Sequence, residues 1–455
     1  MEFKNIPIHD IAIEAKELLQ AGNLEAVKNS LAPLHSTDIA LLFEAVGEGA
    51  VIARLFRLLS PEVASETLLE LEGRVKEELL EVLSHKELTD IVGEMATDDM
   101  TDIVSELSED EGRKVLDGIE WKEAIVVQKL LKYPEDTAGG KMQAELVRVE
   151  LGVSVNDAID EVRKKSEEVQ NIACVFVTDS DGRLEGTVAL DKLILAKPKT
   201  LIEEIVNKDT VRVMTDLDQE EVARIFQRYD LLSLAVVDSE ERLVGRITVD
   251  DVVDVIEEEI FEDFYRMASL NTGERALDNP RRSFGMRSPW LLLNLGTALI
   301  AAGVVKLFEG TIESFVILAV LMPIVAGIGG NAATQTITVI IRGLALGELN
   351  LRNARKVIMK EAIVGLANGL LIGIVAALAA FILGANFMIG LLLFLAMTAS
   401  LLIAGLAGST IPLILKSLKA DPALSSSVFV TACTDVAGFF TFLGLAALFI
   451  KLGLL

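Results

Sequence analysis

Cysteine and histidine are scarce in this chain of 455 residues, which has two cysteines and three histidines. Cys174 lies in a predicted strand and Cys433 in a predicted membrane span, so we expect no disulfide framework and a reducing compartment. Without a histidine and cysteine cluster the chain lacks soft-metal ligands, which argues against selectivity for zinc or copper. The first residues, MEFKNIPIHDIAIEAKELL, lack the apolar core of a signal peptide, so we expect the soluble half to stay in the cytoplasm.

Acidic residues are also scarce after residue 287, where six carboxylates stand against nine Lys or Arg, a net charge of +3. Residues 1–287 hold the other 62 Asp and Glu and 33 Lys and Arg, a net charge of −29. A soluble half this acidic repels nucleic acids, so no nucleic-acid partner is expected, and it suits hard cations or basic partners. The second half is predicted to be a membrane domain.

From about residue 10 to 130 the apolar spacing is helical, and motifs such as DIALLFEAV, VASETLLEL and ELTDIVGEM recur near multiples of 12 residues. One short helix cannot bury its apolar face alone, so the pattern predicts an all-α superhelical N-terminal domain over residues 1–132. In ATDDMTD, Asp98 and Asp102 share one helical face beside Asp99. A solvated face and a cation site are both compatible with this cluster.

An internal repeat follows, in which TDSDGRLEGTVALDKLI and VDSEERLVGRITVDDVV align without a gap at an offset of 59 residues. Each copy has an apolar strand, a polar turn, a second strand and the start of a helix. The pattern resembles a tandem pair of CBS domains, an α/β regulatory module that commonly binds adenine nucleotides or ions, and we assign it residues 133–250. An amphipathic linking helix is predicted next, within residues 251–275. Its apolar stripe consists of Val252, Val255, Ile256, Ile260, Phe264 and Met267.

Five apolar runs long enough to cross a bilayer are predicted within residues 285–455: about 290–308, 314–341, 360–383, 387–414 and 425–449. Lys and Arg collect before the first run, between the second and third, and between the fourth and fifth. These stretches share one side of the membrane, which is cytoplasmic by the positive-inside rule. We therefore expect a multi-pass protein of the cell membrane, with its N-terminal half in the cytoplasm and its C-terminus outside.

The second span, LMPIVAGIGGNAATQTITVIIRG, combines helix-weakening residues with a polar stripe. Pro323 and the glycines predict an irregular helix, and freed backbone groups at membrane depth must face protein or water. Asn331, Thr334, Gln335 and Thr338 follow on one helical face. We interpret the stripe as a water-facing path, with helix packing as the alternative.

The fifth span, SVFVTACTDVAGFFTFLGLAALFI, is interrupted by one carboxylate, Asp435. A charge at the centre of a membrane span costs about 2.5–3.5 kcal/mol, so such residues usually face a bundle interior or a water-filled path. Thr431 and Gly438 are expected on the same face as Asp435, with Cys433 pointing away. Carboxylate and hydroxyl oxygens suit a hard, hydrated cation such as Mg²⁺.

An acidic helical domain, a CBS pair, a linking helix and five spans with PIVAGIGGNAATQ, IIRGLALGEL, KADPAL and TDVAGFF resemble the MgtE family of magnesium channels. The resemblance covers nearly the whole chain and implies a multidomain membrane protein, a homodimer with one pore on its two-fold axis. It implies Mg²⁺ as substrate and regulator, with Asp435, Thr431, Asn331 and Thr334 at the pore and residues 251–267 as a plug. Two Asp435 carboxylates across the axis would match the charge of the ion. Where family members often read Gly-Gly-Asn-x-Gly-Asn-Gln, this chain has GGNAATQ, which changes the pattern of donors and acceptors.

The resemblance also implies that cytosolic Mg²⁺ holds the channel shut by bridging acidic faces of the soluble domains. The implied sensor carboxylates come from the N domain, the second CBS copy, the linking helix and the loop before the fifth span. They are Glu66, Asp98, Asp102, Asp218, Glu220, Asp230, Asp251, Asp254, Glu259, Glu262 and Asp421.

Three functions are compatible with these features: a gated magnesium channel, a proton-coupled secondary divalent-cation transporter with nucleotide-regulated CBS domains, and an intramembrane aspartyl hydrolase. The hydrolase is set aside because it needs two buried carboxylates and the predicted spans contain one, so no enzyme activity is expected. The absence of an inverted-repeat signal favours the channel over the transporter. ATP at the CBS pair stays open, as does passage of cobalt, nickel or manganese.

Overall fold

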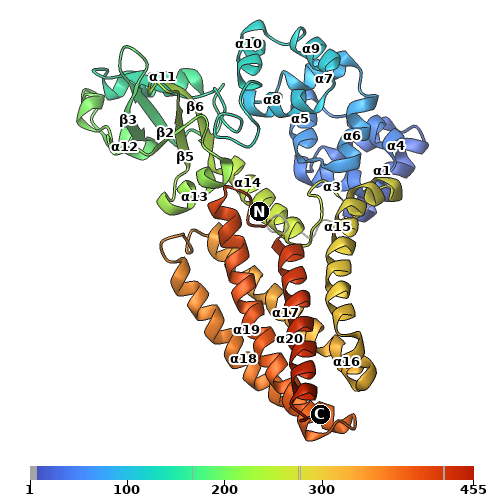
Figure 1. The fold of residues 1–455 in the computed structure, drawn as a ribbon. Helices are drawn as coiled ribbons and strands as arrows, with labels where there is room; N and C mark the ends of the chain where they lie inside the picture. Colours follow the sequence, from blue (N-terminus) through green and yellow to red (C-terminus); the bar gives the residue numbers. More distant parts are fainter. Residues whose placement is uncertain (1–7, 167, 275, 277, 424–425) are drawn as a thin grey trace. The chain divides into compact units, whose positions relative to one another are not determined.

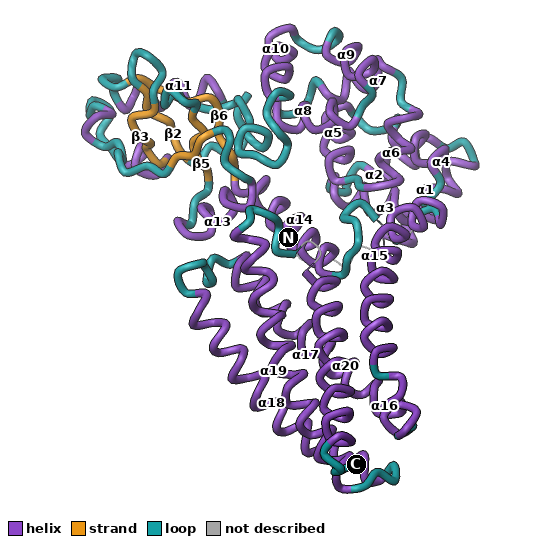
Figure 2. Tube along the Cα trace, viewed as in Figure 1, coloured by secondary structure: helices purple, strands orange, loops and turns teal. Residues whose placement is uncertain are grey.

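The computed structural model describes residues 8–166, 168–274, 276, 278–423 and 426–455. The chain divides into two compact units, Met1–Glu257 and Glu258–Leu455, with the boundary inside helix α14 (Val249–Met267). Figure 1 labels the elements along the chain, and Figure 2 separates helices from strands.

The first unit begins with short helices whose starts repeat every 12 residues. Helices α5 to α10 begin at residues 61, 73, 85, 97, 109 and 121. From α1 to α9 each odd-numbered helix contacts the next odd-numbered one, while α4 contacts α6 and α8 contacts α10. The predicted superhelix is confirmed, because successive helices stack around one continuous apolar core. The helices are α1 (Ile8–Gln20), α2 (Leu24–Leu31), α3 (Ser36–Val46), α4 (Gly49–Phe56), α5 (Pro61–Glu70), α6 (Gly73–Val82), α7 (His85–Val92), α8 (Thr97–Glu106), α9 (Glu109–Leu116) and α10 (Trp121–Leu130).

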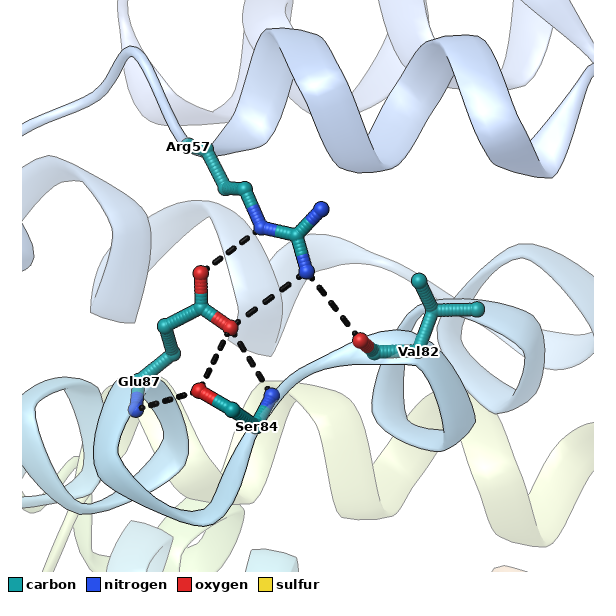
Figure 3. A network of polar contacts seen from close by, with 4 residues as sticks. All are labelled: Arg57, Val82, Ser84 and Glu87. Carbon is teal, nitrogen blue, oxygen red and sulfur yellow. Dashed lines mark hydrogen bonds and ion pairs between the residues drawn. The ribbon is translucent and has the colours of Figure 1, made fainter.

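Polar contacts also link non-consecutive helices of this domain. Figure 3 shows the contacts between Arg57, which follows α4, and Glu87 of α7. Arg57, which follows α4, donates from Nε to Glu87 Oε1 at 2.7 Å and from Nη2 to the Val82 carbonyl at 3.1 Å. The second carboxylate oxygen of Glu87 accepts from the backbone N and the Oγ of Ser84, both at 2.8 Å, and closes a capping box. The hydrogen bond from Arg57 lowers the pKa of Glu87 to about 2. One carboxylate therefore caps α7 and binds it to Arg57, at the end of α4.

Two three-stranded sheets follow, each with one parallel and one antiparallel pairing. Strand β1 pairs parallel with β2 and β2 antiparallel with β3, and β4, β5 and β6 repeat this order. Both antiparallel pairs have the same irregularity at positions 59 residues apart, between Val177 and Thr178 and between Val236 and Val237. The tandem CBS fold is thus confirmed. The elements are β1 (Arg148–Glu150), α11 (Val155–Lys165), β2 (Cys174–Thr178), β3 (Leu184–Ala189), α12 (Leu190–Leu195), η1 (Ile202–Glu204), β4 (Arg212–Met214), α13 (Gln219–Tyr229), β5 (Ser233–Val237) and β6 (Leu243–Thr248).

In the second unit, all five predicted spans are helices of 25 to 31 residues. At 1.5 Å per residue each exceeds the roughly 30 Å of a bilayer core. A short helix, α16, between the first and second spans was not predicted. The helices are α15 (Pro280–Leu307), α16 (Glu309–Ser314), α17 (Ile317–Ala345), α18 (Ala354–Ile382), α19 (Phe387–Ser417) and α20 (Ser426–Lys451).

Helices α18 and α19 approach closely along a row of glycines. A Cβ added at Gly365 would stand 2.6 Å from the Leu401 carbonyl oxygen, and one at Gly369 would stand 2.7 Å from Thr398 Cα. Gly373 continues the row one turn further. Such small residues let helix backbones pack directly in a membrane, where no hydrophobic force drives helix association.

Helix α17 runs unbroken through Pro323 and the glycines at 327, 329 and 330, so the expected irregularity is wrong. Pro323 lies in the second turn of the helix and removes a single ladder donor there. Gly329 serves close packing instead, because a Cβ at this position would stand 2.8 Å from Ser400 Oγ on α19.

The predicted apolar stripe of α14 is confirmed near its two ends. Val252 and Val255 are buried in the core around the second sheet. Met267 packs on a cluster formed by α17, α19 and α20 in the second unit. Ile260 and Phe264, between them, are exposed.

Candidate pore and regulatory sites

Helix α17 has one exposed polar face and one buried apolar face. Asn331, Thr334, Gln335 and Thr338 are exposed, as the predicted stripe requires. The Thr334 hydroxyl donates to the Gly330 carbonyl at 3.1 Å, and that of Thr338 to the Thr334 carbonyl at 2.9 Å. Each hydroxyl oxygen keeps its acceptor capacity, which suits contact with a hydrated cation.

The contacts of α20 place Asp435 beside α17 near the Asn331 end of this stripe. Val430 of α20 packs with Ala333 of α17, and a Cβ at Gly438 would stand 3.7 Å from the Val325 side chain. Asp435 falls between these two contacts. It is half-buried, and within the part of the chain that the structure describes no hydrogen bond or ion pair is made by its carboxylate.

The neighbours of Asp435 on α20 differ in part from the expectation. Thr431 is exposed and shares the open side of the helix, whereas Gly438 is buried against α17 and α19. Cys433 is also exposed. On the open side of α20, the side-chain oxygen beside Asp435 is therefore the hydroxyl of Thr431.

The membrane unit contains a second buried carboxylate, which sequence reasoning missed. Glu361, on α18, is only 5% exposed. The predicted spans therefore contain two carboxylates and not one. The number of carboxylates is no longer an argument against a hydrolase. The sequence signal was present, because Glu361 stands one residue inside the predicted third span.

In the first unit, Asp98, Asp99 and Asp251 form a half-buried to buried acidic cluster where the N domain meets the CBS pair. Asp98 is 6% exposed, and burial followed by repulsion from Asp99 and Asp251 raises its pKa well above the ordinary range. Burial raises the pKa of Asp99 to about 7 and that of Asp102, one turn along, to about 6. Burial also raises the pKa of Asp251, although Thr248 donates to its carboxylate at 2.6 Å. Packed carboxylates with raised pKa values are the arrangement that a bound cation would stabilise.

A buried arginine is connected to this cluster through hydrogen bonds of Gln143. Arg246, on β6, donates from Nη2 to Gln143 Oε1 at 2.7 Å and to the Gln170 carbonyl at 2.6 Å. The amide of Gln143 in turn donates to Asp98 Oδ2 at 3.1 Å. Sequence reasoning missed Arg246, although the repeat carried a signal, since the aligned position in the first copy is the neutral Thr187.

In the second unit, Arg266 of α14 forms ion pairs with two of the predicted sensor carboxylates. Its guanidinium pairs with both Glu262 and Asp421. Ser269 and Ser427 add a hydrogen bond of 3.0 Å between the segment after α14 and α20. Burial and the nearby Asp421 charge raise the pKa of Asp263 to about 6. The end of α14 is thus bound to the loop before the fifth span.

The remaining predicted sensor residues have separate local surroundings. Asp218 caps α13 by accepting from the Glu220 backbone N at 2.9 Å, and Glu220 pairs with Arg224 at 2.5 Å. Asp230 ends the same helix in the left-handed conformation at φ 51°. The other three differ in exposure: Glu66 and Asp254 are exposed and Glu259 is half-buried.

Among the described residues of a single chain, no group of three or more His, Cys, Asp or Glu is arranged to hold a metal ion.

Comparison with known proteins places these features in a family. A family model described as MgtE, divalent cation transporter, matches residues 322–445, the MgtE intracellular N domain matches 34–136, and a CBS domain matches 202–258. The chain is 33% identical to the magnesium transporter MgtE of Thermus thermophilus, over 97% of this chain and 99% of that protein. It is 29% identical to the magnesium transporter MgtE of Bacillus subtilis, over 98% and 99%.

Solved structures match about half of the chain. The crystal structure of the cytosolic domain of the Mg²⁺ channel MgtE in complex with ATP has a TM-score of 0.51 and 35% identity, covering 54% of this chain and 99% of that one. The soluble part of a magnesium transporter has a TM-score of 0.50 and 26% identity, covering 55% and 99%.

The five candidate spans and the family matches define a multi-span membrane transporter with an N-terminal helical domain and a CBS domain, and not an enzyme. The exposed polar stripe lies on membrane helix α17, and the cluster of Asp98, Asp99 and Asp251 lies in the N-terminal half. The chain belongs to the MgtE family of magnesium transporters.

Proposed function

We propose that this chain is a magnesium-selective channel that works as a homodimer in the cell membrane and is shut by cytosolic Mg²⁺. The observation that carries the proposal is the half-buried Asp435, which has no partner among the described residues and lies near the Asn331 end of an exposed stripe of neutral oxygen groups on α17. In a two-fold dimer, two such carboxylates supply a charge of −2 on the axis. The ion binds through its water shell and leaves again, as conduction requires.

Gating in this proposal works through the acidic faces of the soluble half. The raised pKa values of Asp98, Asp99 and Asp251 indicate that their packed arrangement is disfavoured when the carboxylates are charged and no cation is bound. Mg²⁺ replaces this repulsion with bridging and so favours the closed form. The end of α14 transmits the change, because Met267 and Arg266 contact the helices and loop of the membrane unit.

We further propose that the CBS pair binds ATP, which the 35% identical ATP complex of an MgtE cytosolic domain supports. We also propose that the N-terminal half lies in the cytoplasm and the C-terminus outside, which the odd number of candidate spans and the positive-inside rule support.

The deciding experiment is Mg²⁺ flux into liposomes containing the purified protein. Asp435→Asn keeps the size of the side chain and removes its charge, so Mg²⁺ flux or selectivity over monovalent cations should fall at least tenfold while the dimer stays intact. Glu313→Gln, at an exposed carboxylate after α15, is the matched control and should conduct like the parent. Parent-like flux in Asp435→Asn would remove the basis of the pore. Flux that follows an imposed proton gradient and ignores voltage would favour the proton-coupled transporter instead.

A further inference from the structure

Glu361 is a charged residue within the membrane unit. It has no role in the pore or the gate proposed above. It is the eighth residue of α18, and its side chain is almost fully buried. Ionisable residues at membrane depth are costly, and they persist where they are paired or functional.

Three helices accommodate this carboxylate. On α19, a Cβ at Gly405 would stand 2.6 Å from the Glu361 carbonyl oxygen, and one at Gly408 would stand 2.9 Å from Thr336 Cβ. The two glycines let α18 and α17 approach each other across α19. Glu361 Oε2 then accepts a long hydrogen bond of 3.5 Å from Thr336 Oγ1.

The counter-charge comes from the neighbouring residue. Lys360 Nζ lies 2.6 Å from Glu361 Oε1, yet the lysine side chain is 57% exposed. Its flexible stem lets the ammonium reach water while it touches the carboxylate. The lysine therefore neutralises Glu361 only in part and from its exposed side.

Thr336 connects Glu361 to the helix of the proposed pore. The next residue is Gln335, and Thr334 and Thr338 stand two positions away, all on the exposed polar face. None of these three side chains carries a charge. A fixed carboxylate behind such a neutral face adds negative potential along it, and the low dielectric of the bundle transmits that potential over more than one helix.

We propose that Glu361 is a second electrostatic determinant of cation permeation, a buried carboxylate behind the α17 stripe that attracts the divalent ion while Lys360 limits the attraction. The proposal rests on the pore function proposed above. Glu361 acts through the field at α17 and does not touch the ion.

The test measures Mg²⁺ flux in liposomes against Mg²⁺ concentration, at low and high ionic strength. Glu361→Gln keeps the size and an acceptor for Thr336 but loses the charge. Its half-saturating Mg²⁺ concentration should rise about threefold to tenfold, and by less at high salt. Glu361→Asp should stay within about twofold of the parent, and Lys360→Gln should lower the half-saturating concentration. A purely structural pair would shift both neutral variants in the same direction.

Two outcomes separate this inference from the pore itself. If Glu361→Gln and Lys360→Gln both keep the parent half-saturation while Asp435→Asn loses flux, Glu361 is a packing residue and the pore assignment stands. If Asp435→Asn keeps parent flux, the pore fails and the Glu361 proposal fails with it. If Glu361→Gln does not fold, the exposed Lys360 decides alone: a lowered half-saturation supports the proposal, and an unchanged or raised one overturns it.

Discussion

The guanidinium of Arg266 forms an ion pair with the carboxylate of Asp421, across 155 residues of sequence. Arg266 belongs to α14, whereas Asp421 lies in the loop between α19 and α20. Since Glu262 binds the same guanidinium, a cation of the chain itself already holds two carboxylates that the family resemblance assigned to regulatory Mg²⁺. The observed position of the end of α14 therefore has a contribution that does not need a metal ion.

This pair predicts coupled effects on gating. Arg266→Gln and Asp421→Asn should each raise the Mg²⁺ concentration that half-closes the channel by about twofold to fivefold, the range expected for a partly exposed ion pair. The double variant should shift it no further than the larger single effect, because both changes break one interaction. Purely additive shifts would show that the two residues act separately. Arg281→Gln, at an exposed arginine of α15, is the control.

The second prediction concerns the polar stripe of α17. Replacing Asn331 and Thr334 together with leucine should reduce Mg²⁺ flux by about tenfold or more without abolishing the dimer, because an apolar pore face dewets. Val339→Leu enlarges an exposed apolar residue of the same helix and should leave flux unchanged. Intact flux in the double leucine variant would show that the stripe is a packing surface.

The third prediction concerns the soluble sensor. Neutralising Asp251, Asp254 and Asp421 together should leave the channel open until internal Mg²⁺ is about tenfold higher than the parent requires. The soluble half should also lose its protection from proteolysis by Mg²⁺, because the cation-bridged form is no longer favoured. A triple variant that closes at the parent concentration would refute this sensor and direct attention to nucleotide at the CBS pair. The matched control neutralises exposed carboxylates of the N domain: Glu109, Asp110 and Asp117.

The fourth prediction follows from the raised pKa of Asp99. The folded state holds a proton on Asp99 up to about pH 7, whereas the unfolded chain releases it near pH 4. Stability without Mg²⁺ should therefore fall as pH rises from about 4 to 7, by about 1–3 kcal/mol, and level off above that range. Thermal unfolding of the full-length protein measures this slope.

Asp99→Asn removes the titrating group, so it should flatten the slope and raise stability at pH 8. Asp110→Asn, at an exposed carboxylate of α9, should keep the parent slope. Mg²⁺ at pH 8 should restore part of the lost stability in the parent, since a cation replaces the proton. A flat profile in the parent would mean that the cluster is solvated.

Local pattern was enough to predict most of the fold. The 12-residue period of the N domain, the 59-residue CBS repeat and the five apolar runs are each written in consecutive residues, because every unit buries its own apolar face against its neighbour. The same reasoning wrongly predicted an irregular helix at Pro323. A proline near the start of a helix costs one donor, and its position within α17 could not be read from composition.

The sequence by itself determined the domain order, the spans, the family resemblance and the carboxylate Asp435 in the fifth span, since charge and hydropathy are properties of single residues. Tertiary structure alone decided which charges meet. Arg246 is linked to Asp98 through Gln143. Arg266 pairs with Asp421, which is distant in the sequence. Glu361 accepts a hydrogen bond from Thr336 beside glycines of α19. Such pairs join residues from 25 to more than 100 positions apart. Their energies depend on distance and burial, and these quantities exist only when the helices are packed.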